Sequence, residues 1–163
     1  IGNAFDVVLG NPPWVGRGKT SDGEIEKWIF SDKNPFLSLS PKAKEKRKAI
    51  FFPQNQVAHA FMWKAPIHLK VGRTGCLLLP TKVLLNKTDF FQRYWFLQFR
   101  VDFILQLADY SFVLFPEADC PSFVIRFCKS TPQDKSHQIE YVVPKVRLQD
   151  PRSGLIPIYP EDR

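Results

Sequence analysis

Short apolar runs alternate with stretches of helical spacing along most of the chain. Phe5–Gly10 and Thr74–Leu79 are largely apolar runs that glycine or proline ends. This is the pattern of strands that are buried on both faces of a parallel sheet. Val101–Leu107 and Ser122–Cys128 continue the series, and Ile139–Val143 is a candidate fifth strand.

Two segments between these strands have helical periodicity. From Asn55 to about Lys70, apolar side chains recur every four residues, at Val57, Phe61, Ala65 and Leu69. Pro66 lies within this run and should kink or split the helix, because proline lacks an amide hydrogen. Gly72 should end it. Thr88–Gln98 is a second, aromatic-rich helix, in which we expect a core face formed by Phe90, Phe91, Trp95 and Phe96.

The order of elements is strand, helix, strand, helix, strand, strand. Such alternation predicts an α/β fold with parallel strands and right-handed crossovers, while the final pair should be antiparallel. We interpret this as the C-terminal half of a Rossmann-like, doubly wound sheet. Ligands of these sheets bind beyond the carboxyl ends of the strands. Asn11–Trp14 and Pro80-Thr81 are expected there.

The chain divides into four parts within one predicted domain. Residues 1–14 hold a strand and the segment after it, and residues 15–53 resemble a long flexible connection with one short helix near Glu24–Phe30. Residues 54–143 hold the remaining helices and strands, and residues 144–163 form an irregular, proline-rich tail. Since the chain has no initiator Met and opens almost at once into a strand, we expect it to be a piece of a longer protein.

Charge and composition narrow the class of protein. The formal net charge is +7, which suits a polyanionic partner such as nucleic acid. No apolar run approaches the roughly 20 residues that span a bilayer, so no membrane association is expected. Three cysteines and three histidines show no metal-ligand spacing. We therefore predict a reduced, cytoplasmic protein without a structural metal.

Asn11-Pro12-Pro13-Trp14 follows the first strand directly. A planar exocyclic amine is a poor nucleophile, because its lone pair is delocalised into the ring. Two acceptors that each take one N–H return electron density to the nitrogen and stabilise the positive charge that develops on it. The Asn11 side-chain oxygen and the Pro12 carbonyl are candidates, since the prolines hold this backbone extended. Trp14 offers a flat face to a heterocycle.

Phe5–Trp14 also resembles motif IV of N6-adenine DNA methyltransferases from restriction–modification systems. The similarity continues in Gly72–Thr81, a strand that ends in proline, and in Ser122–Lys129, the family's closing strand. It covers about residues 5–130, with a gap over 15–53. The resemblance implies a site-specific, adenine-specific enzyme that transfers a methyl group from S-adenosylmethionine to the adenine N6 amine.

The resemblance implies roles for individual residues. Asn11, Pro12, Pro13 and Trp14 would form the catalytic segment, with Asn11 and the Pro12 carbonyl on the amine. Trp14 and Phe115 would stack on the base. The partner would be double-stranded DNA with its target adenine flipped out, a step that costs a few kcal/mol.

One departure from the family concerns the methyl donor. In this subgroup S-adenosylmethionine sits on a glycine-rich turn that precedes motif IV, and no such turn is present in this chain. The resemblance therefore implies that the chain alone neither binds the donor tightly nor methylates. Its further partners would be the remainder of the same polypeptide or a specificity domain.

A basic segment lies in the long connection. Its five cations are candidates for DNA phosphate contacts: Lys42, Lys44, Lys46, Arg47 and Lys48. The alternative, which we favour, is a solvated charged segment.

Two other functions fit the same residues. Asn-Pro-Pro-Trp suits any planar amine, so an RNA base or a protein glutamine is an alternative substrate. A non-catalytic remnant that binds DNA or a subunit is the second alternative.

Overall fold

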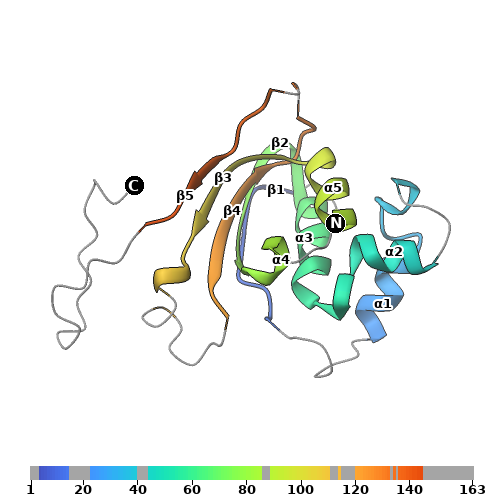
Figure 1. The fold of residues 1–163 in the computed structure, drawn as a ribbon. Helices are drawn as coiled ribbons and strands as arrows, with labels where there is room; N and C mark the ends of the chain where they lie inside the picture. The colour runs from blue at the N-terminus through green and yellow to red at the C-terminus, as the bar shows by residue number, and fades with distance from the viewer. Residues whose placement is uncertain are drawn as a thin grey trace.

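Five strands of the computed structural model form one sheet with the order β1-β2-β4-β3-β5 (Figure 1). The structure describes residues 4–14, 23–39, 44–85, 89–110, 114, 120–132, 134 and 136–144. Its strands are β1 (Phe5–Gly10), β2 (Leu69–Pro80), β3 (Arg100–Gln106), β4 (Ser122–Cys128) and β5 (Glu140–Val142). Its α-helices are α1 (Gly23–Phe30), α2 (Lys44–Phe51), α3 (Val57–His68), α4 (Lys82–Leu85) and α5 (Asp89–Gln98).

The pairing confirms the predicted α/β fold class. β1 and β2 are parallel, and β4 runs antiparallel to both β2 and β3. The antiparallel pair predicted for the last two long strands is thus present, and the short β5 lies parallel to β3. The sequence order did not reveal that β4 inserts between β2 and β3, so that the sheet mixes both orientations.

The prediction that the first strand is buried on both faces is wrong for the described residues. The exposed fractions are 52% for Phe5, 58% for Val7 and 75% for Leu9. β1 is an outermost strand of the sheet, and among the described residues it pairs only with β2. Asp6 is held to β2 by Lys70 Nζ at 2.9 Å and Arg73 Nε at 3.1 Å.

Pro66 does not split α3, although a split was one of the two outcomes expected for this proline. The helix continues to His68 with Pro66 in its last turn, and β2 begins directly at Leu69. A residue other than proline at position 66 would donate to the Met62 carbonyl. That carbonyl instead accepts a hydrogen bond from Trp95 Nε1 of α5 at 3.1 Å. Gly72, which was expected to end the helix, lies within β2.

The segment expected to be a long connection contributes to the core. Its described parts form α1, a 3-10 turn at Leu37–Leu39, and α2. α1 is the short helix predicted near Glu24–Phe30, whereas α2 was not predicted. Ile29, Ile50 and Phe51 from these helices are fully buried.

The core is an aromatic cluster between the helices and the sheet. Trp63 and Trp95 are fully buried, and the ring centroids of Trp95 and Phe127 are 5.2 Å apart. Phe91 is buried as predicted, but Phe90 is 56% exposed and so does not belong to the core face. The predicted face was too wide, because adjacent helical residues point about 100° apart.

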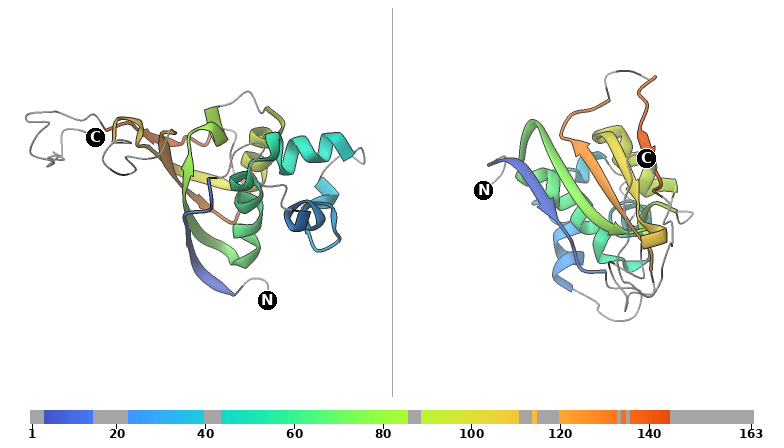
Figure 2. Two further views of the ribbon diagram at one scale, coloured as in Figure 1. Left: turned by 90° about the horizontal axis from the view of Figure 1, so that it is seen from below. Right: turned by 90° about the vertical axis from the view of Figure 1, so that its left-hand side faces the viewer.

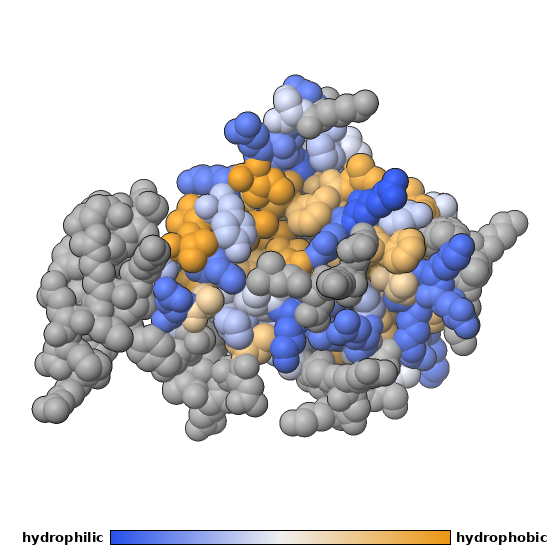
Figure 3. Space-filling model, in the orientation of Figure 1, coloured by the Kyte–Doolittle hydropathy of each residue, from blue (hydrophilic) through white to orange (hydrophobic). Residues whose placement is uncertain are grey.

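Helices α1, α2, α3 and α5 lie on one side of the sheet (Figures 1 and 2). On the other face, Leu9 lies beside Cys76, which pairs with Arg126 of β4. Figure 3 shows hydrophobic side chains exposed among the hydrophilic ones in the orientation of Figure 1. Within the described part of the chain, none of the helices has the length and apolarity needed to cross a bilayer.

Candidate functional site

The carboxyl ends of β1, β2 and β3 lie at one edge of the sheet, together with the amino end of β4. Gly10 pairs with Leu77, Pro80 pairs with Ser122, and Gln106 pairs with Phe123. Asn11–Trp14 follow β1 directly and therefore lie at this edge. Thr81 also lies there, where its amide donates to the Pro121 carbonyl at 2.8 Å. The edge is where doubly wound sheets bind their ligands.

The four residues of the Asn-Pro-Pro-Trp segment differ in burial. Asn11 and Pro13 are exposed, Pro12 is buried, and Trp14 is half-buried. The buried Pro12 anchors the segment, while the Asn11 amide is accessible to a second molecule. Each of the first two residues precedes a proline, which disfavours helical backbone and holds the segment extended.

A cavity of about 330 Å³ lies against this segment. Gly10, Asn11 and Pro12 line one side of it, and Phe61 and Lys64 of α3 line another. Phe61 is 39% exposed, although it belongs to the predicted apolar stripe of its helix. The sequence did not single out Phe61 or Lys64, because a stripe does not distinguish a ring that packs in the core from one that lines a cavity.

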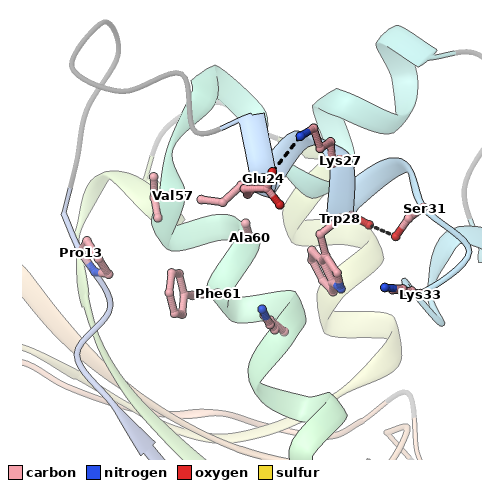
Figure 4. A pocket seen from close by; sticks show the side chains of 11 residues that line it. Pro13, Glu24, Lys27, Trp28, Ser31, Lys33, Val57, Ala60 and Phe61 are labelled. Carbon is pink, nitrogen blue, oxygen red and sulfur yellow. Dashed lines mark hydrogen bonds and ion pairs between the residues drawn. The ribbon is translucent and has the colours of Figure 1, made fainter.

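A second cavity, of about 670 Å³, lies between α1 and α3. Figure 4 shows Trp28 projecting from α1, with Phe61 between it and Pro13 of the Asn-Pro-Pro-Trp segment. Pro13, Phe61 and Lys64 line both cavities, so the two are neighbours. Lys64 Nζ lies 5.8 Å from the centroid of the Trp28 ring.

The structure does not test every predicted site residue. Phe115, the second candidate for base stacking, lies outside the described residues, as does Lys42 of the basic segment. Lys44, Lys46, Arg47 and Lys48 belong to α2, and Lys48 Nζ forms an ion pair with Glu26 Oε1 at 2.7 Å. That ion pair would have to open before Lys48 bound a phosphate.

His59 is a buried histidine of α3, remote in sequence from the Asn-Pro-Pro-Trp segment. Its Nε2 lies 3.3 Å from the Val83 carbonyl, and its ring meets Phe91 edge-on with centroids 4.4 Å apart. Burial lowers the pKa of His59 from 6.5 to about 4, although the hydrogen bond to Val83 acts in the opposite direction. The residue is therefore neutral in the folded protein at pH 7.

Stability should fall as the pH drops from about 6.5 toward 4. Within this window the unfolded chain protonates His59 and the folded chain does not, so protons favour unfolding. The difference of about 2.5 pKa units corresponds to roughly 3 kcal/mol at most. Urea unfolding of the wild type and of His59→Leu across this range measures it. The pH slope should be shallower in His59→Leu than in the wild type; equal slopes in the two proteins would contradict the assignment.

Comparison with known proteins identifies solved structures that have a similar fold. No protein-family model matches the chain, and no curated protein matches it. Among solved structures, the methyltransferase subunit of a type I restriction-modification system from Streptococcus thermophilus matches 98% of the chain, with a TM-score of 0.59 and 18% identity. A modification subunit of a putative type I restriction enzyme from Vibrio vulnificus YJ016 matches 91% of it, with a TM-score of 0.59 and 17% identity.

A putative class I S-adenosylmethionine-dependent methyltransferase from Listeria monocytogenes also matches 92% of the chain, with a TM-score of 0.56 and 14% identity. The chain spans 30%, 27% and 39% of the length of these three proteins, respectively. Identities this low establish the fold and nothing finer. The chain has the Rossmann-like α/β fold of S-adenosylmethionine-dependent methyltransferases.

Proposed function

We propose that this chain is the acceptor-binding part of an N6-adenine DNA methyltransferase of restriction–modification type. The observation that carries the proposal is the position of Asn11–Trp14, directly after β1 at the ligand-binding edge of a methyltransferase sheet. The alternation of exposed and buried residues in this segment supports it, because the amide is presented while the backbone is anchored.

The segment acts on the amine through two acceptors. The Asn11 side-chain oxygen and the Pro12 carbonyl each accept one N–H of the target amine. This favours a pyramidal nitrogen whose lone pair can attack, and it stabilises the positive charge on the nitrogen as the new N–C bond forms. S-adenosylmethionine, when bound, supplies the methyl group on a positively charged sulfur, which keeps the electron pair of the broken bond. The methylated nitrogen then releases a proton to solvent.

Trp14 stacks on the adenine in this proposal, and Phe115 is the second aromatic. Extruding a base from duplex DNA costs a few kcal/mol. Stacking on an aromatic side chain contributes roughly 1–3 kcal/mol per base. Two such contacts therefore offset the cost of extrusion.

The donor-binding part belongs, in this proposal, to residues outside this chain. Leu9 of β1, two residues before Asn11, is exposed to solvent. The two matched subunits from type I restriction systems are each more than three times as long as the matched region. Strands that pair in parallel, as β1 and β2 do, are normally covered on both faces. The exposed Phe5, Val7 and Leu9 are thus where the rest of the domain would pack.

The test is methyl transfer from radiolabelled donor by the full-length protein, with the product digested and identified by mass spectrometry. N6-methyladenine in duplex DNA is the expected product, and the 163-residue chain alone should give none. If the label is found in RNA or in a protein glutamine, that molecule, and not DNA, is the substrate. Absence of transfer to all three substrates, together with retained DNA binding, would favour a non-catalytic remnant.

A further inference from the structure

The cavity between α1 and α3 combines a positive charge with an aromatic face. Its lysines are Lys27, Lys33 and Lys64, and its acid is Glu24. Glu24 already forms an ion pair with Lys27 at 2.8 Å. Lys33 and Lys64 form no ion pair with any residue that the structure describes. Two positive charges therefore remain available to an anionic ligand.

Trp28 places a flat apolar surface beside these charges. Its ring is half-buried against the core, with Lys64 Nζ 5.8 Å from the ring centroid. Ser31 Oγ donates to the Trp28 carbonyl at 2.9 Å, and Lys33 follows in the same turn after α1 (Figure 4). Lys64 Nζ lies over this indole face, so a base that stacks on Trp28 would displace the ammonium group from the ring, and the ammonium group could then bind the phosphate.

The position of the cavity identifies the strand that would supply this nucleotide. Pro13 lines the cavity, so its wall is continuous with the segment that holds the target amine in the proposed function. Its volume of about 670 Å³ is within the range of small-ligand sites. The nucleotide next to the target base would have to leave the stack as the target base does, which costs a further few kcal/mol, and stacking on Trp28 would offset part of that cost.

We propose that this cavity binds a nucleotide of the DNA strand next to the target base, with its phosphate on Lys33 and Lys64 and its base on Trp28. The inference rests on the proposed function for the identity of the strand. It assigns DNA contacts to α1 and α3, in place of the basic segment on α2.

The test measures binding of a short fluorescein-labelled single-stranded DNA to the full-length protein by anisotropy, at several salt concentrations. Lys33→Gln with Lys64→Gln should weaken binding roughly tenfold and should reduce the slope of log affinity against log salt by about 0.7, since each neutralised phosphate of a single strand contributes about 0.7. Trp28→Leu keeps an apolar side chain but removes the flat face. It should weaken binding roughly tenfold with the salt slope unchanged.

Two sets of control variants match these changes. Lys82→Gln with Arg93→Gln removes the same charge from exposed positions on α4 and α5, and Phe90→Ala removes an exposed ring from α5. The controls should bind DNA as the wild type does. Equal weakening by the charge control, or unchanged affinity in the cavity variants, would overturn the inference. Because Lys33 and Lys64 are exposed, their variants remain informative even if Trp28→Leu proves unstable.

This outcome is separable from that of the proposed function. If the protein methylates adenine and the cavity variants bind DNA normally, the nucleotide site is contradicted and the proposed function stands. Cavity variants that lose DNA affinity, in a protein that makes no methyladenine, would support the nucleotide site and remove the function.

Discussion

Replacing Asn11 by alanine should lower kcat for methyl transfer by the full-length protein by roughly 100-fold or more, with DNA affinity unchanged. In the proposed mechanism the acceptor oxygen of Asn11 acts on charge that develops in the transition state, and removal of one such polar group typically costs 10²–10³ in kcat. Because the side chain is exposed, its truncation leaves no cavity in the core. The loss should therefore appear in kcat and not in the free energy of unfolding.

A matched control for this variant is Gln138→Ala, which removes an exposed amide just before β5. The kinetic comparison is a single-turnover assay at saturating DNA, with DNA affinity measured separately by anisotropy. Full activity in Asn11→Ala would remove Asn11 from the mechanism. A parallel loss of DNA affinity would assign it to substrate binding instead of the chemical step.

The sequence correctly predicted those strands whose apolar residues are in fact buried within this chain. Thr74–Leu79 and Ser122–Cys128 are strands because their side chains pack in the middle of the sheet. The edge position of β1 was not predictable from Phe5–Gly10. An apolar run looks the same whether its cover is supplied by this chain or by another segment, and only the strand order distinguishes the two.

The helices of residues 23–51 were only partly predictable, for a different reason. α2 contains four cations, from Lys44 to Lys48, which resemble a solvated charged segment. Its place in the fold is set by the apolar residues that follow, Ile50 and Phe51, and by the Trp63 Nε1 hydrogen bond to the Ile50 carbonyl at 3.0 Å. These contacts are tertiary and have no local signature.

The motif of the candidate site was predictable from the sequence, but the cavities beside it were not. Asn11–Trp14 were identified from their order after a strand, and the structure places this strand end at the expected edge of the sheet. The neighbouring cavities depend on α1 crossing near α3, which brings Trp28 and Lys64 together from positions 36 residues apart. No spacing rule connects residues on two different helices.

Replacing Gly75 by alanine should lower the free energy of unfolding by about 3 kcal/mol, and Gly75→Val should prevent stable folding. A Cβ atom on Gly75 would lie 2.3 Å from Cζ and 2.6 Å from Cε1 of the Phe127 ring. Gly75 and Phe127 are paired directly across β2 and β4. The ring therefore lies over the glycine and occupies the space that a side chain would need.

Phe127 has little freedom to move away. It is fully buried, with its ring centroid 5.2 Å from that of Trp95 and 6.0 Å from that of Phe99. A methyl group at Gly75 would therefore displace an interlocked aromatic cluster and not a single flexible side chain. Urea unfolding followed by circular dichroism measures the effect. Gly23→Ala is the matched control, because a Cβ on Gly23 would meet no atom within 4 Å.

A double-mutant cycle separates this collision from any general intolerance of β2 to side chains. Phe127→Leu is destabilising alone, because it removes part of a buried ring. Combined with Gly75→Ala it should cost less than the sum of the two single changes, since the smaller side chain leaves room for the new methyl group. Strict additivity would show that the ring is not the obstacle. β2 also pairs with β1, which leads into Asn11–Trp14. Methyl transfer should therefore follow stability across the same cycle, and the double variant should lose less activity than the two single changes predict together.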